Sequence, residues 1–516
     1  MDTSSTAVEK AVKKRKFSFP TAYTVLFLVL LLATVLTHVI PAGKYAKLTY
    51  DEEAKSFVVT DPKGDTKNYE ATQQTLTNLG INIKLEKFTS GSLSKPVAIP
   101  KTYENVEAHP TSFKDFFMAP IRGFADTQDI MLFVLILGGI IGVLTQTGAI
   151  NAGFAALSRV TKGKEFVLIV LVNFLISLGG TTFGMAEETI ALFPILIPIF
   201  LVAGYDAMVG IAAIYLGSVV GGIFSTTNVF ATGTASAVAG ISPSDGMTFR
   251  FIGLVIGVAI TLVYLLRYAS KVKHNPASSL IYDQRQAVEA SLKHMGHDVP
   301  PFTKARALMI LVFVSAFFIL TWGVSSQDWW FAEMSMLFLI VAFIIILLAI
   351  FFTGLSEKQA MNSFISGSAD LVGVGLSIGI ARGVNFLLED GSISDTILFY
   401  AANSVQGMSP SLFIIVVMLI YVVLGFFIQS SSGLAVLSIP IIAPLADTVG
   451  LPRDTVVSAF QYGQGIMSFV APTGLILVVL SLFNITFDRW LKFVLPIMGI
   501  ISVLAVIMLM AQVHFG

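Results

Sequence analysis

Residues 179–189 read Gly-Gly-Thr-Thr-Phe-Gly-Met-Ala-Glu-Glu-Thr, and Pro194 and Pro198 follow within otherwise apolar sequence. An ionised carboxylate at the middle of a bilayer costs roughly 2.5–3.5 kcal/mol on insertion scales. Glycine and proline interrupt a helix, and an interrupted backbone at that depth survives only where protein or a water-filled cavity covers it. We therefore predict the tip of a re-entrant hairpin that lines a substrate site. The alternative is a solvated loop between two spans.

The composition indicates a membrane protein. Of 516 residues, 55% are hydrophobic and only 12% are charged, whereas soluble domains carry about 25% charged residues. Apolar runs near the length of a membrane span recur along the chain, which is typical of a polytopic helical protein. The net charge of zero gives no sign of nucleic-acid binding. The chain has no cysteine and its six histidines show no metal-ligand spacing, so we predict no metal site and no cofactor.

The order of apolar and polar stretches predicts how the chain is divided. The predicted parts are a cytoplasmic N-terminus (1–20), a first transmembrane helix (21–42), an extracellular loop (43–128), transport repeat 1 (129–268), a cytoplasmic linker (269–304), two scaffold helices (305–353) and transport repeat 2 (366–511). Basic residues 13–16 before the first span hold the N-terminus in the cytoplasm. Within the extracellular loop, residues 45–60 favour a small β-hairpin, and residues 111–124 favour an amphipathic helix on the membrane surface.

The two halves of the chain resemble each other. A constant offset of 246 positions relates Pro194 to Pro440 and Pro198 to Pro444, and it also relates two pairs of glycines. Gly204 corresponds to Gly450, and Gly217 corresponds to Gly463. Each half contains an apolar arm–tip–arm unit, with the second tip at 429–433, followed by an apolar helix that is interrupted, at 226–228 and at 472–474. By the distribution of basic residues, the first copy starts outside and the second starts inside. We therefore predict an all-α polytopic membrane protein with two inverted repeats, each with a re-entrant hairpin and a broken transmembrane helix.

Three ionisable residues fall deep within the predicted membrane segments, namely Glu187, Glu188 and Arg382. Such residues face a cavity and pair with one another or with a substrate. An amino acid with a cationic side chain suits this set, with Arg382 on its α-carboxylate and a glutamate on its distal cation. Two alternatives remain open. Arg382 pairs with a glutamate and locks the two halves together, or one glutamate is protonated and carries a coupling proton.

Uncharged polar side chains surround the predicted tips and breaks. The candidate substrate-binding residues of this kind are Thr181, Thr182, Asn228, Ser430, Ser431, Ser432, Gln464 and Thr473. Each of them has the donors and acceptors needed to bind a substrate. The alternative for each is an ordinary hydrogen bond between helices, which Ser, Thr, Asn and Gln also provide.

Several motifs of this chain resemble one known family. They are Leu-Thr-Gln-Thr-Gly-Ala-Ile at 144–150, Gly-Met-Ala-Glu-Glu-Thr at 184–189, Ala-Arg-Gly at 381–383 with Gly-Ser-Ile at 391–393, and Ser-Ser-Gly at 431–433 leading to Pro-Ile-Ile-Ala-Pro-Leu-Ala-Asp at 440–447. They are similar to the C4-dicarboxylate anaerobic carrier-like family of the ion transporter superfamily. The similarity covers nearly the whole chain except residues 62–98. The chain departs from it at Gln464, where the family often has an acidic residue.

The resemblance implies a fold with inverted hairpins, a homodimer and a place in the bacterial inner membrane. The family includes exchangers of arginine and ornithine, which need no coupling cation. We therefore predict a multi-pass secondary transporter that exchanges basic amino acids, arginine for ornithine, by alternating access, with the lipid bilayer as its other partner. The alternative within transport is a carrier of C4-dicarboxylates or other carboxylates coupled to H⁺ or Na⁺. An intramembrane enzyme lacks any supporting motif, and a passive channel does not need broken helices.

Overall fold

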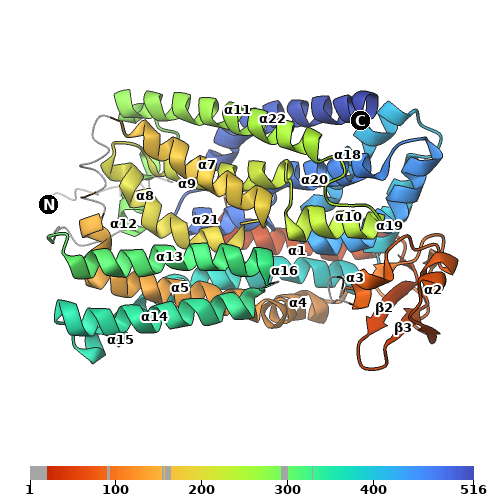
Figure 1. Cartoon of the computed structure of the whole chain (residues 1–516), viewed down its shortest axis with the longest axis horizontal. Helices are drawn as coiled ribbons and strands as arrows, with labels where there is room; N and C mark the ends of the chain where they lie inside the picture. The colour runs from red at the N-terminus through yellow and green to blue at the C-terminus, as the bar shows by residue number, and fades with distance from the viewer. Residues whose placement is uncertain are drawn as a thin grey trace, which may run out of the picture.

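The computed structural model describes residues 20–89, 93, 95–153, 156, 164–291, 300–327 and 329–516. The predicted cytoplasmic N-terminus, with its basic residues 13–16, lies outside the described residues except for Pro20. Most helices run along the long axis of the molecule, and the strands gather at one end of it (Figure 1). Within the described ranges, nine helices are long and apolar enough to cross a membrane. The chain is therefore a multi-pass helical membrane protein.

A small β domain follows the first span, α1 (Ala22–Val39). Its strands are β1 (Gly43–Lys44), β2 (Lys47–Asp51), β3 (Ser56–Thr60), β4 (Thr66–Glu70), β5 (Val97–Ala98) and β6 (Glu104–Asn105), with short helices α2 (Gln73–Asn78) and α3 (Leu85–Thr89) between them. One antiparallel sheet has the order β4-β3-β2-β5, and β1 pairs with β6. The hairpin predicted within residues 45–60 is confirmed as β2–β3. Leu48, Phe57 and Phe88 are buried in its core.

Two helix pairs lie antiparallel beside each other and form one side of the molecule. They are α4 (Phe113–Asp126) with α5 (Gln128–Gln146), and α15 (Glu357–Asp370) with α16 (Val372–Asp390). Helix α4 packs along α16, and α5 packs along α15. Ion pairs from Arg122 to Asp390 and from Asp126 to Arg382 join α4 to α16. The helix predicted at 111–124 is confirmed as α4, which contacts α16 through its small residues Ala119 and Gly123, whereas its position on the membrane surface stays a prediction.

Two helical hairpins enter from opposite ends of the molecule (Figure 1). The first hairpin consists of α7 (Phe166–Thr182), the 3₁₀ helix η1 (Glu187–Leu192) and α8 (Phe193–Val202), whereas the second hairpin consists of α18 (Pro410–Phe427) and α19 (Ser431–Thr448). Helix α8 lies toward the end away from the strands, and α19 lies beside the β domain. The two predicted arm–tip–arm units are thus confirmed as hairpins of opposite direction.

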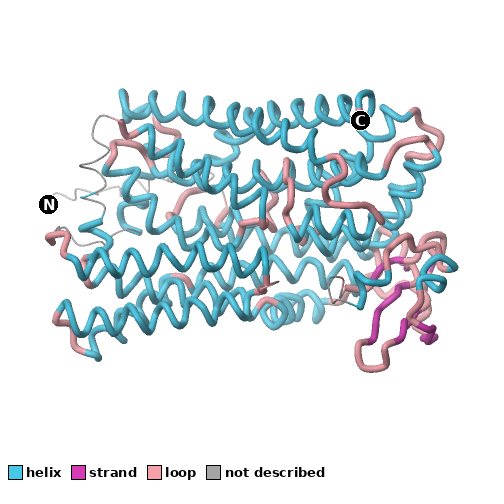
Figure 2. The backbone as a smooth tube through the Cα atoms, viewed as in Figure 1, coloured by secondary structure: helices cyan, strands magenta, loops and turns pink. Residues whose placement is uncertain are grey.

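Each hairpin packs on an interrupted helix that follows it in the chain. The first interrupted helix consists of α9 (Ala207–Ile223), the π turn η2 (Val229–Gly233) and α10 (Thr234–Ala239); the second consists of α20 (Arg453–Ser468) and α21 (Leu475–Leu482). Loop segments consequently lie in the middle of the molecule, between helices (Figure 2). A Cβ at Gly217 would lie 2.8 Å from the carbonyl oxygen of Asn173 in the first hairpin. A Cβ at Gly463 would lie 2.3 Å from the carbonyl oxygen of Met418 in the second hairpin. The matched glycines therefore permit the same close approach of hairpin and helix in both repeats.

The remaining helices are four predicted spans and one short helix, α17, that was not predicted. They are α11 (Met247–His274) and α22 (Phe487–Phe515), which pack together, α13 (Lys304–Ser326) and α14 (Phe331–Thr353), and α17 (Ser394–Ser404) between α16 and the second hairpin. The linker carries η3 (Pro276–Ser278), η4 (Tyr282–Gln284) and α12 (Arg285–Ser291). Helices α13 and α14 lie along one long edge, next to α5 and α15 (Figure 1).

Candidate functional site

A cavity of about 510 Å³ lies where the two hairpin tips, the two helix interruptions, the α4–α5 junction and α16 meet. We call it the central cavity. Its lining includes most of the predicted site residues, namely Glu187, Glu188, Asn228, Arg382, Ser430, Ser431, Ser432, Gln464 and Thr473. Segments that are far apart in the sequence thus place their polar side chains in one space. This volume suits a small organic molecule.

The first hairpin tip brings the two glutamates to the central cavity. Glu188 is only 3% exposed, and its Oε2 accepts a hydrogen bond from the Ala186 amide at 3.0 Å. Gly184 has φ +83°, and a Cβ there would lie 2.7 Å from the Asn228 side chain, so the bend requires glycine. Among the described residues, neither glutamate has a cationic side chain within ion-pair distance. Both carboxylates thus line the cavity, and no cation of the described part of the chain is paired with them.

Arg382 pairs with an aspartate and not with either of the two glutamates. Its Nε lies 2.5 Å from Asp126 Oδ2, at the end of α4. The alternative in which Arg382 pairs with Glu187 or Glu188 is therefore wrong for this structure. Asp126 itself lines the central cavity, as does Asp129 at the start of α5. Arg382 thus presents a guanidinium to the cavity while one carboxylate holds its Nε edge.

The second hairpin tip meets the β domain. Lys95 Nζ donates to Ser432 Oγ at 2.9 Å and to Ser430 Oγ at 3.4 Å, and Lys95 lines the central cavity. Ser430 also accepts from the Gly433 amide at 3.2 Å, which caps the start of α19. Gln464 Nε2 donates to the Gln429 carbonyl at 3.1 Å and so fixes this tip to α20. A residue of the β domain is therefore part of the site.

Thr181 and Thr182, which were also predicted to bind the substrate, do not line the central cavity. Thr181 Oγ1 accepts from the Thr226 amide at 2.9 Å, and Thr182 Oγ1 donates to the Leu178 carbonyl at 2.6 Å. Both hydroxyls are thus used by the backbone of the hairpin and of the interrupted helix. Asn228 lines the cavity, but its Oδ1 also accepts from the amides of Phe230 and Ala231 at 2.9 and 3.0 Å, so it caps the segment after the interruption.

Sequence reasoning missed three charged residues of the central cavity: Lys95, Asp126 and Asp129. A signal existed for Asp126, because Ala125-Asp126 matches Ala369-Asp370 in the other repeat. Lys95 follows no pattern, since it is one of many lysines in a polar loop. With these residues included, the cavity lining holds four carboxylates and two cations, a formal charge of −2 when all are ionised.

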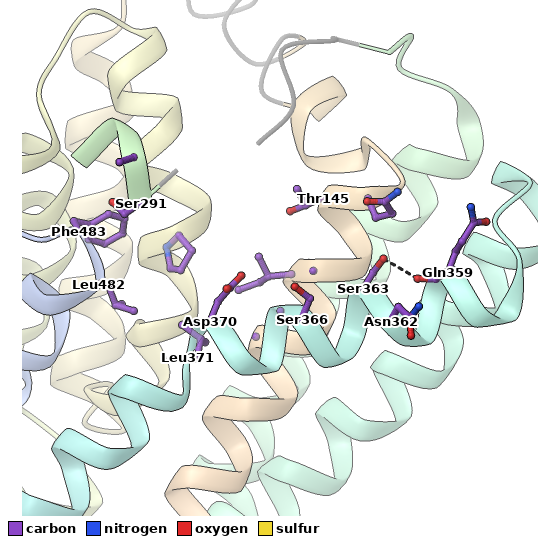
Figure 3. Close-up of a pocket in the computed structure, with 17 residues that line it drawn as sticks. Thr145, Ser291, Gln359, Asn362, Ser363, Ser366, Asp370, Leu371, Leu482 and Phe483 are labelled. Carbon is purple, nitrogen blue, oxygen red and sulfur yellow. Dashed lines mark hydrogen bonds between the residues drawn. The ribbon is translucent and has the colours of Figure 1, made fainter. Parts of the chain in front are cut away.

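A second cavity, of about 630 Å³, lies toward the end of the molecule away from the β domain. We call it the linker-side cavity, because Ala290 and Ser291 of α12 line it. On one side lie Asp370 and Ser366 of α15, and Leu482 and Phe483 lie across from them (Figure 3). Asp370 corresponds to Asp126 by the repeat. The corresponding helices α4 and α15 thus each end at an aspartate, one in each cavity.

The chain was compared with known proteins. The family model described as C4-dicarboxylate anaerobic carrier (DcuC) matches residues 19–514. An uncharacterized protein of Haemophilus influenzae is 47% identical over 98% of this chain and 99% of its own length. A protein of Escherichia coli with the name "Putative basic amino acid antiporter YfcC" is 27% identical over 99% of both chains.

Two solved structures are also similar to this chain. The MtrF efflux pump of Neisseria gonorrhoeae has a TM-score of 0.41 at 15% identity, covering 96% of both chains. The YdaH transporter of Alcanivorax borkumensis has a TM-score of 0.42 at 14% identity, covering 96% of this chain and 99% of its own. The family match spans nearly the whole chain and includes both hairpins and the central cavity. The chain is a membrane carrier and belongs to the C4-dicarboxylate anaerobic carrier (DcuC) family.

Proposed function

We propose that this carrier exchanges basic amino acids, with arginine and ornithine as the two substrates, across the bacterial inner membrane. Both molecules have a carboxylate, an α-amine and a distal cation, so one site can accept either in turn. Basic residues ahead of the first span support a cytoplasmic N-terminus, which puts the β domain outside. The homodimer implied by the family resemblance remains part of the proposal.

The observation that carries this proposal is the charge of the central cavity. Glu187 and Glu188 line it without a protein cation at ion-pair distance among the described residues, whereas Arg382 is held by Asp126. A buried carboxylate is costly unless a cation accompanies it. A substrate with a net positive charge supplies that cation and leaves its own carboxylate for the basic side of the cavity. A basic amino acid meets both conditions.

Alternating access is supported by the position of the two cavities. The central cavity includes the second hairpin tip and the β-domain side, whereas the linker-side cavity lies at the other end. Both cavities separate the α4–α5 and α15–α16 pairs from the hairpin elements. Inverted repeats allow the two halves to exchange shapes, so that the site opens to one side at a time. In this scheme the linker-side cavity is the route on the cytoplasmic side.

A carrier of dicarboxylates is the second candidate, because Lys95 and Arg382 both line the central cavity. Two cations would match two carboxylates. The four carboxylates of the same lining oppose a dianion. The name of the family also refers to dicarboxylates, so the transport experiment includes a dicarboxylate.

Counterflow in proteoliposomes tests the proposal. Labelled arginine is offered outside to vesicles loaded with ornithine, arginine, succinate or buffer alone. We expect uptake with internal ornithine or arginine and background uptake with succinate or buffer. Labelled succinate offered to vesicles loaded with succinate is the matching arm. Succinate counterflow without arginine counterflow would contradict the proposed function and favour the dicarboxylate carrier.

A further inference from the structure

Lys95 is the only charged side chain of the β domain in the lining of the central cavity, as far as the described residues show. It lies just before β5, and β5 packs against α19 of the second hairpin. Its ammonium donates to Ser432 Oγ at 2.9 Å and to Ser430 Oγ at 3.4 Å. The β domain therefore extends a charged group over the hairpin tip and into the site.

The surroundings of this ammonium favour an anion. Within the described residues, Lys95 has no carboxylate at ion-pair distance, and its hydrogen-bond partners are two hydroxyls. The first turn of α19 begins at Ser431, and the N-terminal end of a helix disfavours a cation and favours an anion. Arg382 shares the cavity and is a second cation near Lys95. Two cations and a helix end thus converge near the second tip. The carboxylates of Asp126 and Glu389 also act on the ammonium, and a bound anion would relieve the repulsion that remains between the two cations.

The opposite charge is supplied by the first hairpin tip. Glu187 and Glu188 reach the same cavity from η1, in the other repeat. Ser430 and Ser432, which hold Lys95, come from the second tip. A zwitterionic ligand with an additional cation can therefore place its carboxylate at the second tip and its distal cation at the first.

We propose that Lys95 is a substrate-binding residue that binds the carboxylate of the substrate together with Arg382. This inference rests on the proposed function only for the identity of the substrate, because any transported carboxylate would meet the same two cations. It makes the extracellular β domain part of the specificity site. The substrate is then enclosed by two hairpin tips and by a domain outside the repeats.

The test replaces Lys95 by Met and by Arg, and uses Lys67→Met as the matched control. Lys67 is exposed on β4 of the same domain. A hydrogen-bonded charge pair contributes about 1.5–3 kcal/mol, which corresponds to a rise of roughly tenfold to hundredfold in KM. We expect such a rise in the KM for arginine uptake in Lys95→Met, a KM near that of the natural protein in Lys95→Arg, and no change in Lys67→Met.

A second measurement separates carboxylate binding from a structural role of Lys95. Agmatine is arginine without its carboxylate, and its inhibition constant against arginine uptake is measured in the same variants. The ratio between the inhibition constant of agmatine and the KM for arginine should fall at least tenfold in Lys95→Met, because only arginine loses a contact. An unchanged ratio, or an unchanged KM for arginine, overturns the inference.

The inference and the proposed function fail in different ways. If the natural protein transports succinate and not arginine, the proposed function is wrong, and the same variants are then measured with succinate. Lys95→Met should raise the KM for succinate, with Lys67→Met unchanged. Equal KM values for succinate in all variants would overturn the role of Lys95 whatever the substrate of the carrier.

Discussion

The two hairpin tips attach to the interrupted helices in the same way but carry different chemistry. Thr227 Oγ1 donates to the Thr182 carbonyl at 3.3 Å in the first repeat, and Thr473 Oγ1 donates to the Phe426 carbonyl at 3.0 Å in the second. The first tip then presents two glutamates, whereas the second presents three consecutive serines and meets Lys95. The repeat therefore reproduces the backbone support, while the ligand chemistry of the site comes from residues that differ between the copies.

The largest loss of exchange is expected when the charge of the first tip is removed. Glu188→Gln keeps the size of the side chain but removes the carboxylate that is 3% exposed in the cavity lining. Losing one member of a desolvated charge pair costs about 2–5 kcal/mol, so arginine–ornithine exchange should fall roughly hundredfold or more. Counterflow in proteoliposomes with equal amounts of folded protein measures it.

The matched control for Glu188→Gln is Glu53→Gln at the exposed turn between β2 and β3, which should retain the exchange activity. Arg382→Ala should abolish exchange as Glu188→Gln does, because Arg382 binds the opposite end of the substrate in our proposal. Wild-type uptake by both Glu188→Gln and Arg382→Ala would show that the site is elsewhere.

The backbone of the two tips differs as well, which gives the second prediction. Gly184 has φ +83° and contacts Asn228, so Gly184→Ala introduces a Cβ into a left-handed residue and a close contact. Strain of this kind costs of order 1–3 kcal/mol. We expect a lower unfolding temperature in detergent and reduced uptake.

Gly433→Ala in the second hairpin is the control for Gly184→Ala. A Cβ at Gly433 would lie 3.0 Å from Ser430 Oγ and 3.3 Å from Ser430 Cβ, and Gly433 does not have the positive φ of Gly184. The expected change in its unfolding temperature is therefore small. Equal losses of stability in the two variants would contradict the strained bend that we assign to the first tip.

A carboxylate placed at the second tip should weaken the binding of arginine. Ser432→Asp places a carboxylate beside Lys95 Nζ, which now donates to the Ser432 hydroxyl at 2.9 Å. An internal ion pair then competes with the carboxylate of the substrate, and the KM for arginine should rise about tenfold.

A double-mutant cycle checks the reason for that change. If Ser432→Asp acts through Lys95, the variant that combines it with Lys95→Met should have a KM no higher than the worse single variant. Multiplicative effects of the two substitutions would mean that Ser432 and Lys95 act independently.

The smallest expected effect concerns pH. Burial, with the nearby Arg382 guanidinium, lowers the pKa of the Lys95 ammonium below its ordinary value, against the opposite effect of Asp126 and Glu389. Lys95 therefore loses its charge at a lower pH than an exposed lysine, and the affinity for the substrate carboxylate should decrease by a few fold as the outer pH becomes alkaline.

The Lys95→Arg variant separates this effect from the titration of the substrate's own α-amine, because arginine stays charged over the same range. Measuring the KM for arginine against outer pH should give a flatter profile for Lys95→Arg than for the natural protein. Identical profiles would exclude Lys95 as the titrating group.

The spans and hairpins were predictable because their signals are local. Long apolar runs indicate helices, and Gly184, Pro194 and Pro440 mark bends within them. Helix α15 was not predicted, because its sequence is too polar to be recognised as a span. It is stable because it packs on α5, where Ser368 Oγ donates to the Leu135 carbonyl at 2.8 Å.

The charged part of the site was only partly predictable, because its pairs join distant residues. Arg382 and Asp126 are 256 positions apart, and Lys95 and Ser432 are 337 positions apart. Hydropathy shows that Arg382 and the glutamates need partners but does not show which ones. Only the antiparallel packing of α4 along α16 selects Asp126.

The β domain is attached on two sides. The Tyr45 amide donates to Asp395 Oδ2 at 3.0 Å and the Tyr103 ring stacks on Phe399 at 4.0 Å, which fastens the domain to α17. On the other side it touches the second hairpin through Lys95. If the hairpin travels relative to α17 during transport, the stacked rings keep the domain in place and the lysine must detach in every cycle. The β domain would then stay fixed, and the strength of the contact between Lys95 and Ser432 would set the rate at which the carrier leaves its outward-facing form.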